Sequence, residues 1–279
     1  MEIIIARHAG FCFGVERAID IVKKSAMEDD NVVTFGPIIH NPQVVNELAE
    51  SGVSTIKELD KVESNMSVVV RSHGIEKKEA QYLYENAGKV IDAACPFVQK
   101  AQRSGEKLSH ECDCVIILGE SDHPEVKGII SYTDGNYKVI ENAGEADNLP
   151  KVKTYGLLAQ TTQNKKMFRE VEEKLRSKCD ELIVARTICI ATEYRQDAAI
   201  EVASNVEVMI VVGGKNSANT TRLYHLCKEI CPKTYHIETE SELNADMFLN
   251  VNKVGLTAGA STPIYLLDKV REYINEVAK

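Results

Sequence analysis

One pattern occurs three times in this chain and constrains its fold more than any other feature. Each copy has a short apolar strand, then a cysteine, then a segment with helical periodicity; the cysteines are Cys12, Cys95 and Cys189. A second apolar strand follows and ends in a glycine 24 residues after the cysteine in every copy, at Gly36, Gly119 and Gly213. Equal spacing at three places indicates an internal repeat.

Further positions recur within each copy. Four residues beyond the glycine, a polar side chain stands at a predicted helix start; these residues are His40, His123 and Ser217. A third strand ends in small or polar residues that include His73, Thr161 and Ser261. Short apolar strands that alternate with helices predict an α/β fold of three similar small lobes, each with a parallel sheet flanked by helices.

The repeat also predicts the lobe boundaries. We expect lobe 1 over 13–96, lobe 2 over 97–190, and lobe 3 over 191–279 together with 1–12. The last copy ends before a fourth strand, so we expect the strand at 2–6 to complete it. Polar residues beyond parallel strands face the ligand-binding edge of a sheet. Three such edges in a pseudo-threefold ring would meet at one central cavity.

Composition excludes several classes of protein. The 279 residues carry 33 Lys and Arg against 42 Asp and Glu, a net charge of −9, which argues against a nucleic-acid binder. Apolar runs fall short of the ~20 residues that span a bilayer. Residues 1–9 lack the layout of a signal peptide, so we expect a cytoplasmic protein without a membrane partner.

Seven of the eight cysteines fall into two groups. Cys112 and Cys114 lie on a strand pattern, and Cys227 and Cys231 have helical spacing, so we interpret all four as packing residues. The three repeat cysteines would converge on the central cavity, where three thiolates suit a soft metal centre. A [4Fe–4S] cluster held by three thiolates keeps one iron open, and zinc on three cysteines is the competing assignment.

The polar residues at the strand ends suit an anion. Imidazoles, hydroxyls, an amide and helix N-termini can together hold a diphosphate. The candidate residues for such a site are His40, His73, His123, Ser217, Asn219 and Ser261.

One carboxylate lies close to this set in the sequence. Glu125 follows His123 by two residues and would act as a general acid beside the open iron, with Thr161 and Thr192 relaying or orienting the proton. We therefore take Glu125, Thr161 and His123 as the candidate catalytic residues.

Taken together, the motifs closely resemble the LytB/IspH-type hydroxymethylbutenyl diphosphate reductases over nearly the whole chain. In order, these motifs are Gly10-Phe11-Cys12-Phe13-Gly14-Val15, Ile39-His40-Asn41, Ser72-His73-Gly74, Asp92-Ala93-Ala94-Cys95-Pro96, His123-Pro124-Glu125-Val126, Gln160-Thr161-Thr162, Thr187-Ile188-Cys189, and Thr257-Ala258-Gly259-Ala260-Ser261.

The resemblance implies a three-lobed cloverleaf around one [4Fe–4S] cluster held by Cys12, Cys95 and Cys189. It implies a two-electron reductive dehydroxylation of (E)-4-hydroxy-3-methylbut-2-enyl diphosphate to isopentenyl and dimethylallyl diphosphate, the last step of the non-mevalonate isoprenoid pathway. Gln160 and Thr161 match the segment that closes over the substrate. Reduced ferredoxin or flavodoxin is the implied electron donor, and we expect a monomer.

Two positions depart from the family pattern. Ala218 stands where a second serine is common, and Glu193-Tyr194 replaces a small polar pair after Cys189.

Two other functions remain as alternatives. A quinolinate-synthase-like dehydratase would bind carboxylates through basic residues, for which Arg71 and Lys215 are the candidates. A non-catalytic iron–sulfur redox sensor would need an output module, and the chain has no spare segment for one.

Overall fold

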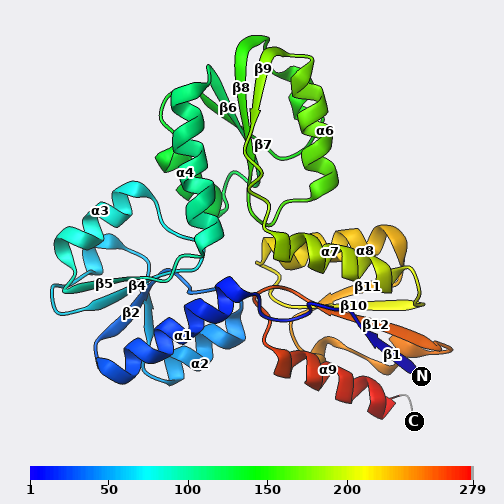
Figure 1. The fold of residues 1–279 in the computed structure, drawn as a ribbon. Coiled ribbons are helices and arrows are strands. Elements are labelled where there is room, and N and C mark those ends of the chain that lie inside the picture. The colour runs from blue at the N-terminus through cyan, green and yellow to red at the C-terminus, as the bar shows by residue number, and fades with distance from the viewer. Residues whose placement is uncertain (278–279) are drawn as a thin grey trace. The chain divides into compact units, whose positions relative to one another are not determined.

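The computed structural model describes residues 1–277. Over these residues the chain forms three sheets of four strands each, and every strand pairing is parallel (Figure 1). Helices flank the sheets, which confirms the predicted α/β class. The last two residues of the predicted third lobe, Ala278 and Lys279, lie outside the described residues.

The three sheets share one strand order. The first has the order β3-β2-β4-β5, the second β7-β6-β8-β9 and the third β11-β10-β12-β1. Their strands are β2 (Val32–Phe35), β3 (Ser54–Ile56), β4 (Ser67–Val70) and β5 (Lys89–Asp92); β6 (Cys114–Leu118), β7 (Tyr137–Ile140), β8 (Val152–Ala159) and β9 (Cys179–Val184); β10 (Val208–Val212), β11 (Thr234–Ile237), β12 (Lys253–Ala258) and β1 (Glu2–Ile5).

Helices connect these strands in chain order. They are α1 (Phe13–Glu28), α2 (Pro42–Glu50), α3 (Lys77–Asn86), α4 (Pro96–Glu111), α5 (Pro124–Tyr132), α6 (Lys165–Arg176), α7 (Ile190–Ala203), α8 (Ala218–Ile230) and α9 (Ile264–Val277). Short 3-10 turns are found at Leu59–Lys61, Glu145–Asn148, Glu240–Glu242 and Ala245–Phe248. None of the helices within residues 1–277 is long and apolar enough to cross a bilayer.

The strand at the N-terminus completes the third sheet. β1 pairs in parallel with β12, in a register that sets Glu2 opposite Lys253 and Ile5 opposite Leu256. β1 therefore takes the place that β5 and β9 hold in the other two sheets, as the repeat predicts. In each sheet this edge strand leads directly to one of the repeat cysteines.

The chain divides into two compact units. The first unit comprises Met1–Glu16, His40–Asn46 and Ile190–Lys279, and it contains the sheet of β1, β10, β11 and β12. The second unit comprises Arg17–Ile39 and Glu47–Cys189, and it contains the other two sheets. The lobe boundaries at 96 and 190, and the cloverleaf arrangement, stay predictions.

Each central strand is buried on both faces, as expected for a parallel sheet. Along β10, Ile210 and Val212 pack with Leu266 and Val270 of α9, whereas Met209 packs on the opposite face. Figure 1 shows α7 and α8 on one side of this sheet and α9 on the other. The alternation of side chains along β10 therefore builds two separate cores in the first unit.

Gly255 of β12 marks how closely α7 approaches the sheet. A Cβ atom at Gly255 would lie 2.5 Å from the Met209 Sδ atom and 2.7 Å from a methyl group of Val202 in α7. We expect Gly255→Ala to lower the free energy of unfolding by about 1–3 kcal/mol through overpacking, measured by urea denaturation. Gly144→Ala is the control, because Gly144 is exposed with φ −65°. Equal stability of the two variants would contradict this packing.

Candidate active site

The three repeat cysteines occupy equivalent positions. Each immediately precedes a helix, because α1, α4 and α7 begin one residue later. Each also donates its backbone N–H to the carbonyl of the second residue beyond the neighbouring strand: Cys12 to Ala260 after β12 at 3.1 Å, Cys95 to Ser72 after β4 at 2.9 Å, and Cys189 to Thr161 after β8 at 2.9 Å. The three copies of the sequence repeat therefore also have the same backbone hydrogen bond at their cysteines.

The glycines of the repeat are equivalent as well. Their backbone N–H groups each donate to the last residue of the neighbouring edge strand: Gly36 to Ile56 at 2.7 Å, Gly119 to Ile140 at 2.9 Å, and Gly213 to Ile237 at 2.8 Å. Each glycine therefore ends its strand in the same way. The loops that follow all start from the carboxyl edge of a parallel sheet, where ligands bind in folds of this kind.

Some of the remaining cysteines are more deeply buried than these three. Cys12, Cys95 and Cys189 are half-buried, whereas Cys227 and Cys231 are buried. The Cys227 Sγ atom lies 3.9 Å from the Ala199 carbonyl, and burial raises the pKa of this thiol to about 12. Burial likewise raises the pKa of Cys112 to about 11. These thiols stay protonated at neutral pH, which agrees with a packing role.

The donor chemistry of the three repeat cysteines fits a thiolate-bound iron–sulfur group. Cys12 belongs to the first unit, and Cys95 and Cys189 belong to the second. Over the described residues, no group of three or more His, Cys, Asp or Glu side chains is arranged to hold a metal ion. The gathering of the three thiolates therefore stays a prediction, supported by their equivalent backbone geometry.

Glu125 and Thr161 form a buried pair in the second unit. Glu125 lies in the first turn of α5 and is 1% exposed. One of its carboxylate oxygens accepts the backbone N–H of Thr161 at 2.6 Å, and the other accepts the Thr161 hydroxyl at 2.9 Å. The structure thus brings together two of the predicted catalytic residues. Thr192 lies in α7 of the first unit.

Two histidines lie next to each other in the same unit. The rings of His73 and His123 meet edge to face, with centroids 5.7 Å apart. His123 is the N-cap of α5, and its Nδ1 accepts the backbone N–H of Glu125 at 3.1 Å. A neutral His123 ring therefore carries its proton on Nε2. Since both histidines were predicted from separate loops, their contact supports a shared role.

Gln160 is the first residue after β8 and is fully buried. Its Oε1 accepts the backbone N–H of Glu120 at 3.1 Å. Its Nε2 has no hydrogen-bond partner within residues 1–277. A buried amide N–H group without a hydrogen-bond partner lowers the stability of the fold unless a ligand or water accepts from it.

A second set of predicted residues lies in the first unit. Ser217 is the N-cap of α8, and Asn219 lies in the first turn of that helix. The Ser261 hydroxyl donates to the His40 carbonyl at 3.1 Å, and a Cβ atom at Gly214 would approach the same carbonyl at 2.7 Å. The loops that carry His40, Ser261 and Ser217 therefore pack closely together.

Asn219 has an unusual environment. Its side chain is 5% exposed, yet neither amide atom has a hydrogen-bond partner within residues 1–277. An amide buried without partners is rare and calls for a ligand or water. The N-terminus of a helix such as α8 also favours anions. This environment fits the predicted anion site.

His40 differs from its repeat partners in one respect. His123 and Ser217 are N-caps, but the helix after His40 begins only at Pro42. Asn41 holds the capping position, since its Oδ1 accepts the backbone N–H of Val44 at 3.1 Å. The expected helix start at His40 is therefore wrong by one residue, because Asn is a strong N-cap and Pro suits the first helical position.

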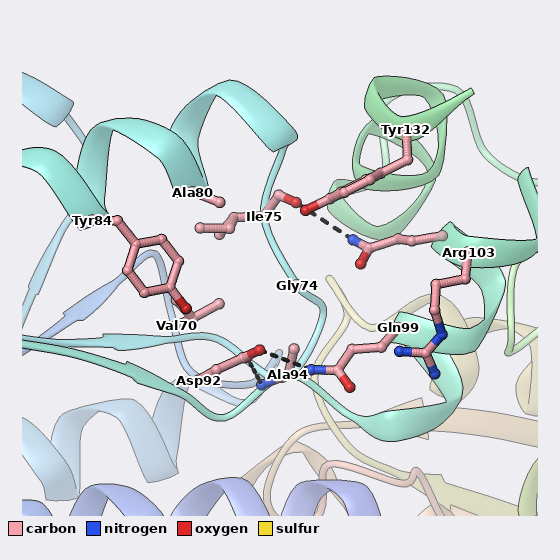
Figure 2. Close-up of a pocket in the computed structure, with 11 residues that line it drawn as sticks. Val70, Gly74, Ile75, Ala80, Tyr84, Asp92, Ala94, Gln99, Arg103 and Tyr132 are labelled. Carbon is pink, nitrogen blue, oxygen red and sulfur yellow. Dashed lines mark hydrogen bonds between the residues drawn. The ribbon is translucent and has the colours of Figure 1, made fainter. Parts of the chain in front are cut away.

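A cavity of about 230 Å³ lies elsewhere in the second unit. Figure 2 shows its space between Tyr84 of α3 and Tyr132 of α5, with Asp92 and Gln99 below. None of the residues that line it is a predicted site residue, although Gly74 follows His73 and Ala94 precedes Cys95. We therefore place the candidate site at the loops themselves and not in this cavity.

Two supporting residues had no assigned role in the sequence analysis. The Thr187 hydroxyl donates to the Ala159 carbonyl at 2.6 Å and accepts from the Ala159 N–H at 2.9 Å, which ties β8 to the segment before Cys189. The Asp92 carboxylate accepts the Ala94 N–H at 2.8 Å just before Cys95. In the sequence, the signal that could have identified Thr187 and Asp92 is their position shortly before a repeat cysteine.

Comparison with known proteins now identifies relatives. A family model described as LytB protein matches residues 3–275. A protein of Geobacter sulfurreducens named 4-hydroxy-3-methylbut-2-enyl diphosphate reductase is 46% identical over 99% of this chain and 98% of its own length. A protein of the same name from Geotalea uraniireducens is 45% identical over 100% of this chain and 99% of its own length.

Two solved structures are also similar. One is described as (E)-4-hydroxy-3-methyl-but-2-enyl diphosphate reductase, the terminal enzyme of the non-mevalonate pathway; it is 42% identical, with a TM-score of 0.71, over 99% of this chain and 100% of its own. The second, described as an E-1-hydroxy-2-methyl-but-2-enyl-4-diphosphate reductase from Plasmodium falciparum, is 26% identical with a TM-score of 0.89, and the match covers 100% of this chain and 88% of the other. With this match along its length, the chain belongs to the LytB family.

Proposed function

We propose that this protein reduces (E)-4-hydroxy-3-methylbut-2-enyl diphosphate to isopentenyl and dimethylallyl diphosphate. The reaction consumes two electrons and two protons; the allylic C–O bond breaks, the hydroxyl leaves as water, and a C–H bond forms. The names of relatives at 45–46% identity support this activity. Within the chain, the observation that carries it is the identical backbone hydrogen bond of the three repeat cysteines.

Cys12, Cys95 and Cys189 would hold a [4Fe–4S] cluster. When bound, such a cluster would supply the electrons and, at its open iron, a Lewis acid for the substrate hydroxyl. All three thiols are half-buried, and each lies at the start of a helix beyond the carboxyl edge of a sheet. Their short backbone bonds orient each cysteine relative to its own sheet.

Glu125 would supply protons to the departing hydroxyl and to the allylic carbon. Its carboxylate is held by two donors from Thr161, which orient both oxygens inside the protein. After Glu125 gives up one proton, the Thr161 hydroxyl can relay the second to it, because this hydroxyl donates to Glu125 while its own lone pairs stay able to accept. His123, bonded to the Glu125 backbone through Nδ1, would present Nε2–H to the substrate.

The diphosphate would be bound by residues from both sets. In the first unit, the buried amide of Asn219 and the hydroxyls of Ser217 and Ser261 are neutral donors near a helix N-terminus. His40, His73 and His123 would add imidazole donors, and Gln160 would bind through its buried Nε2. Ala218 provides no hydroxyl, so the remaining donors carry this interaction.

The carboxylate-binding alternative has weaker support. It needs basic side chains that are available to a substrate, but the Arg71 Nε donates to the Gly74 carbonyl at 3.0 Å. Lys215 forms an ion pair with Glu242. Both basic candidates are thus engaged within the protein. The sensor alternative gains no support, since the relatives are named as reductases.

The reaction needs an external electron donor. We propose reduced ferredoxin or flavodoxin in this role, with the enzyme acting as a cytoplasmic monomer. The net charge of −9 disfavours nucleic acid as a partner.

Replacement of single cysteines tests the cluster ligands. We expect Cys12→Ser, Cys95→Ser and Cys189→Ser each to remove most of the brown absorption at about 410 nm from anaerobically prepared protein. Cys227→Ala is the control and should keep the colour, because its buried thiol packs against the Ala199 carbonyl. If all four variants kept or lost the colour together, the ligand assignment would be wrong.

Glu125→Gln tests the proton donor. The amide keeps the shape of the side chain but cannot release a proton, so we expect turnover to fall by about 10²–10⁴-fold, measured with a reduced-dye assay. Colour at about 410 nm and thermal stabilisation by pyrophosphate should persist. Near-normal turnover in this variant would remove Glu125 from the mechanism.

Asn219→Leu separates stability from binding. Replacing a buried amide that lacks partners with an apolar side chain of similar size should raise the ligand-free free energy of unfolding by about 1 kcal/mol. The same change should weaken pyrophosphate binding by about tenfold or more, measured by calorimetry. Asn86→Leu alters an exposed helical amide and serves as the control. Unchanged pyrophosphate affinity in Asn219→Leu would exclude this amide from the anion site.

A further inference from the structure

The loop that leads to Cys12 rests along one helix, α7. Ala6 packs in the same apolar cluster as Ala199 of that helix. The His8 ring stacks on the Tyr194 ring, with centroids 5.7 Å apart and planes inclined by 26°. The Arg195 Nη2 donates to the Gly10 carbonyl at 2.7 Å. Successive residues of the loop thus contact α7 from Ala6 up to two positions before Cys12.

The backbone of this loop needs such support. His8 has φ +62°, a left-handed conformation that is uncommon for a residue other than glycine, and Gly10 has φ +105°. Glycine adopts a positive φ readily, whereas a residue such as His8 keeps this conformation only where its surroundings determine it. The contacts of His8 and Gly10 are made by Tyr194 and Arg195, which are consecutive residues of α7. The two helix residues therefore hold the two unusual positions of the loop.

Arg195 is buried to an unusual extent for a charged residue. Its side chain is 2% exposed, and removing a guanidinium from water is costly unless hydrogen bonds compensate. Its Nη2 atom donates directly to the main chain of the loop at Gly10, so the guanidinium ties this part of the loop to α7. Tyr194, in contrast, is 53% exposed and covers the loop from the surface.

Helix α7 also begins at Ile190, directly after Cys189. One helix therefore starts at one repeat cysteine and, one to two turns later, contacts the loop of another. Since a helix is stiff over this length, a shift of the Cys12 loop relative to α7 would alter the position of Cys12 with respect to the helix that follows Cys189.

We propose that Arg195, assisted by Tyr194, is a positioning residue that holds the Cys12 loop against α7 in the conformation in which Cys12 serves as a ligand. This inference rests on the proposed role of Cys12. It also explains why a tyrosine occupies position 194, where a small polar residue is expected after Cys189. In this chain the Tyr194 ring packs on His8. The Arg195 side chain acts on the loop and not on the substrate.

Amide hydrogen exchange of the full-length protein tests the inference without relying on a cluster. The Cys12 N–H, bonded to Ala260, should exchange about tenfold faster in Arg195→Gln. The equivalent N–H of Cys95, bonded to Ser72 in the second unit, is the internal reference and should change less than about twofold. Arg195→Lys keeps the charge and should restore part of the protection.

Iron retention gives a second readout. In anaerobically prepared protein, the absorption at about 410 nm should decay about tenfold faster in Arg195→Gln than in the unmodified chain when an iron chelator is added. Asp197→Asn changes an exposed residue of the same helix and should leave both readouts unchanged. A chain without colour would argue against the proposed function, whereas the exchange result would still report on Arg195.

The outcomes are distinct. Faster exchange confined to the Cys12 loop supports the positioning role, and unchanged exchange at Cys12 overturns it. Equal acceleration at Cys12 and Cys95 would mean that Arg195 only supports the fold, which also overturns the role. If Arg195→Gln does not fold, Tyr194→Ala decides, because it truncates an exposed ring; it should accelerate exchange at Cys12 about threefold and leave Cys95 unchanged.

Discussion

The backbone hydrogen bond between each repeat cysteine and the loop beyond the neighbouring strand is the constraint on which the site depends. It joins Cys12 to Ala260, Cys95 to Ser72 and Cys189 to Thr161. Because adjacent strands are parallel, both ends of each bond lie at the carboxyl edge of a sheet. The bond therefore places a thiol next to the polar loop that follows a neighbouring strand of the same sheet, and this loop belongs to another copy of the repeat.

The chemistry around these bonds differs between the two units. In the second unit, the loop after β8 supplies Thr161, whose backbone accepts from Cys189 and whose side chain and N–H hold Glu125. In the first unit, Ser261 follows Ala260 directly and contacts the His40 carbonyl. One scaffold thus presents a buried acid in one repeat and neutral hydrogen-bonding groups in another.

Much of the fold could be predicted because the repeat consists of residue types that indicate particular backbone features. The equally spaced glycines mark the ends of strands, and each of them makes an equivalent backbone hydrogen bond. The apolar runs mark strands that are buried on both faces. That the N-terminal strand completes the third sheet followed from the count of strands alone, whereas its pairing with β12 is seen only in the structure.

Other features depend on contacts that sequence spacing does not encode. The capping role of Asn41 was missed because His40 holds the repeated position, although Asn is the better N-cap. Arg195 looked like an ordinary helical residue, since its burial arises only when the loop near Gly10 packs on α7. Long-range packing of this kind, between residues 185 positions apart, is visible only in the folded chain.

The central claim is that three cysteines far apart in the sequence hold one iron–sulfur group with an open iron. Anaerobic determination of iron and sulfide, combined with a Mössbauer spectrum, tests it most directly. The account predicts about four irons and four sulfides per chain, with one iron spectroscopically distinct from the other three. A single zinc ion, or four equivalent irons, would contradict it.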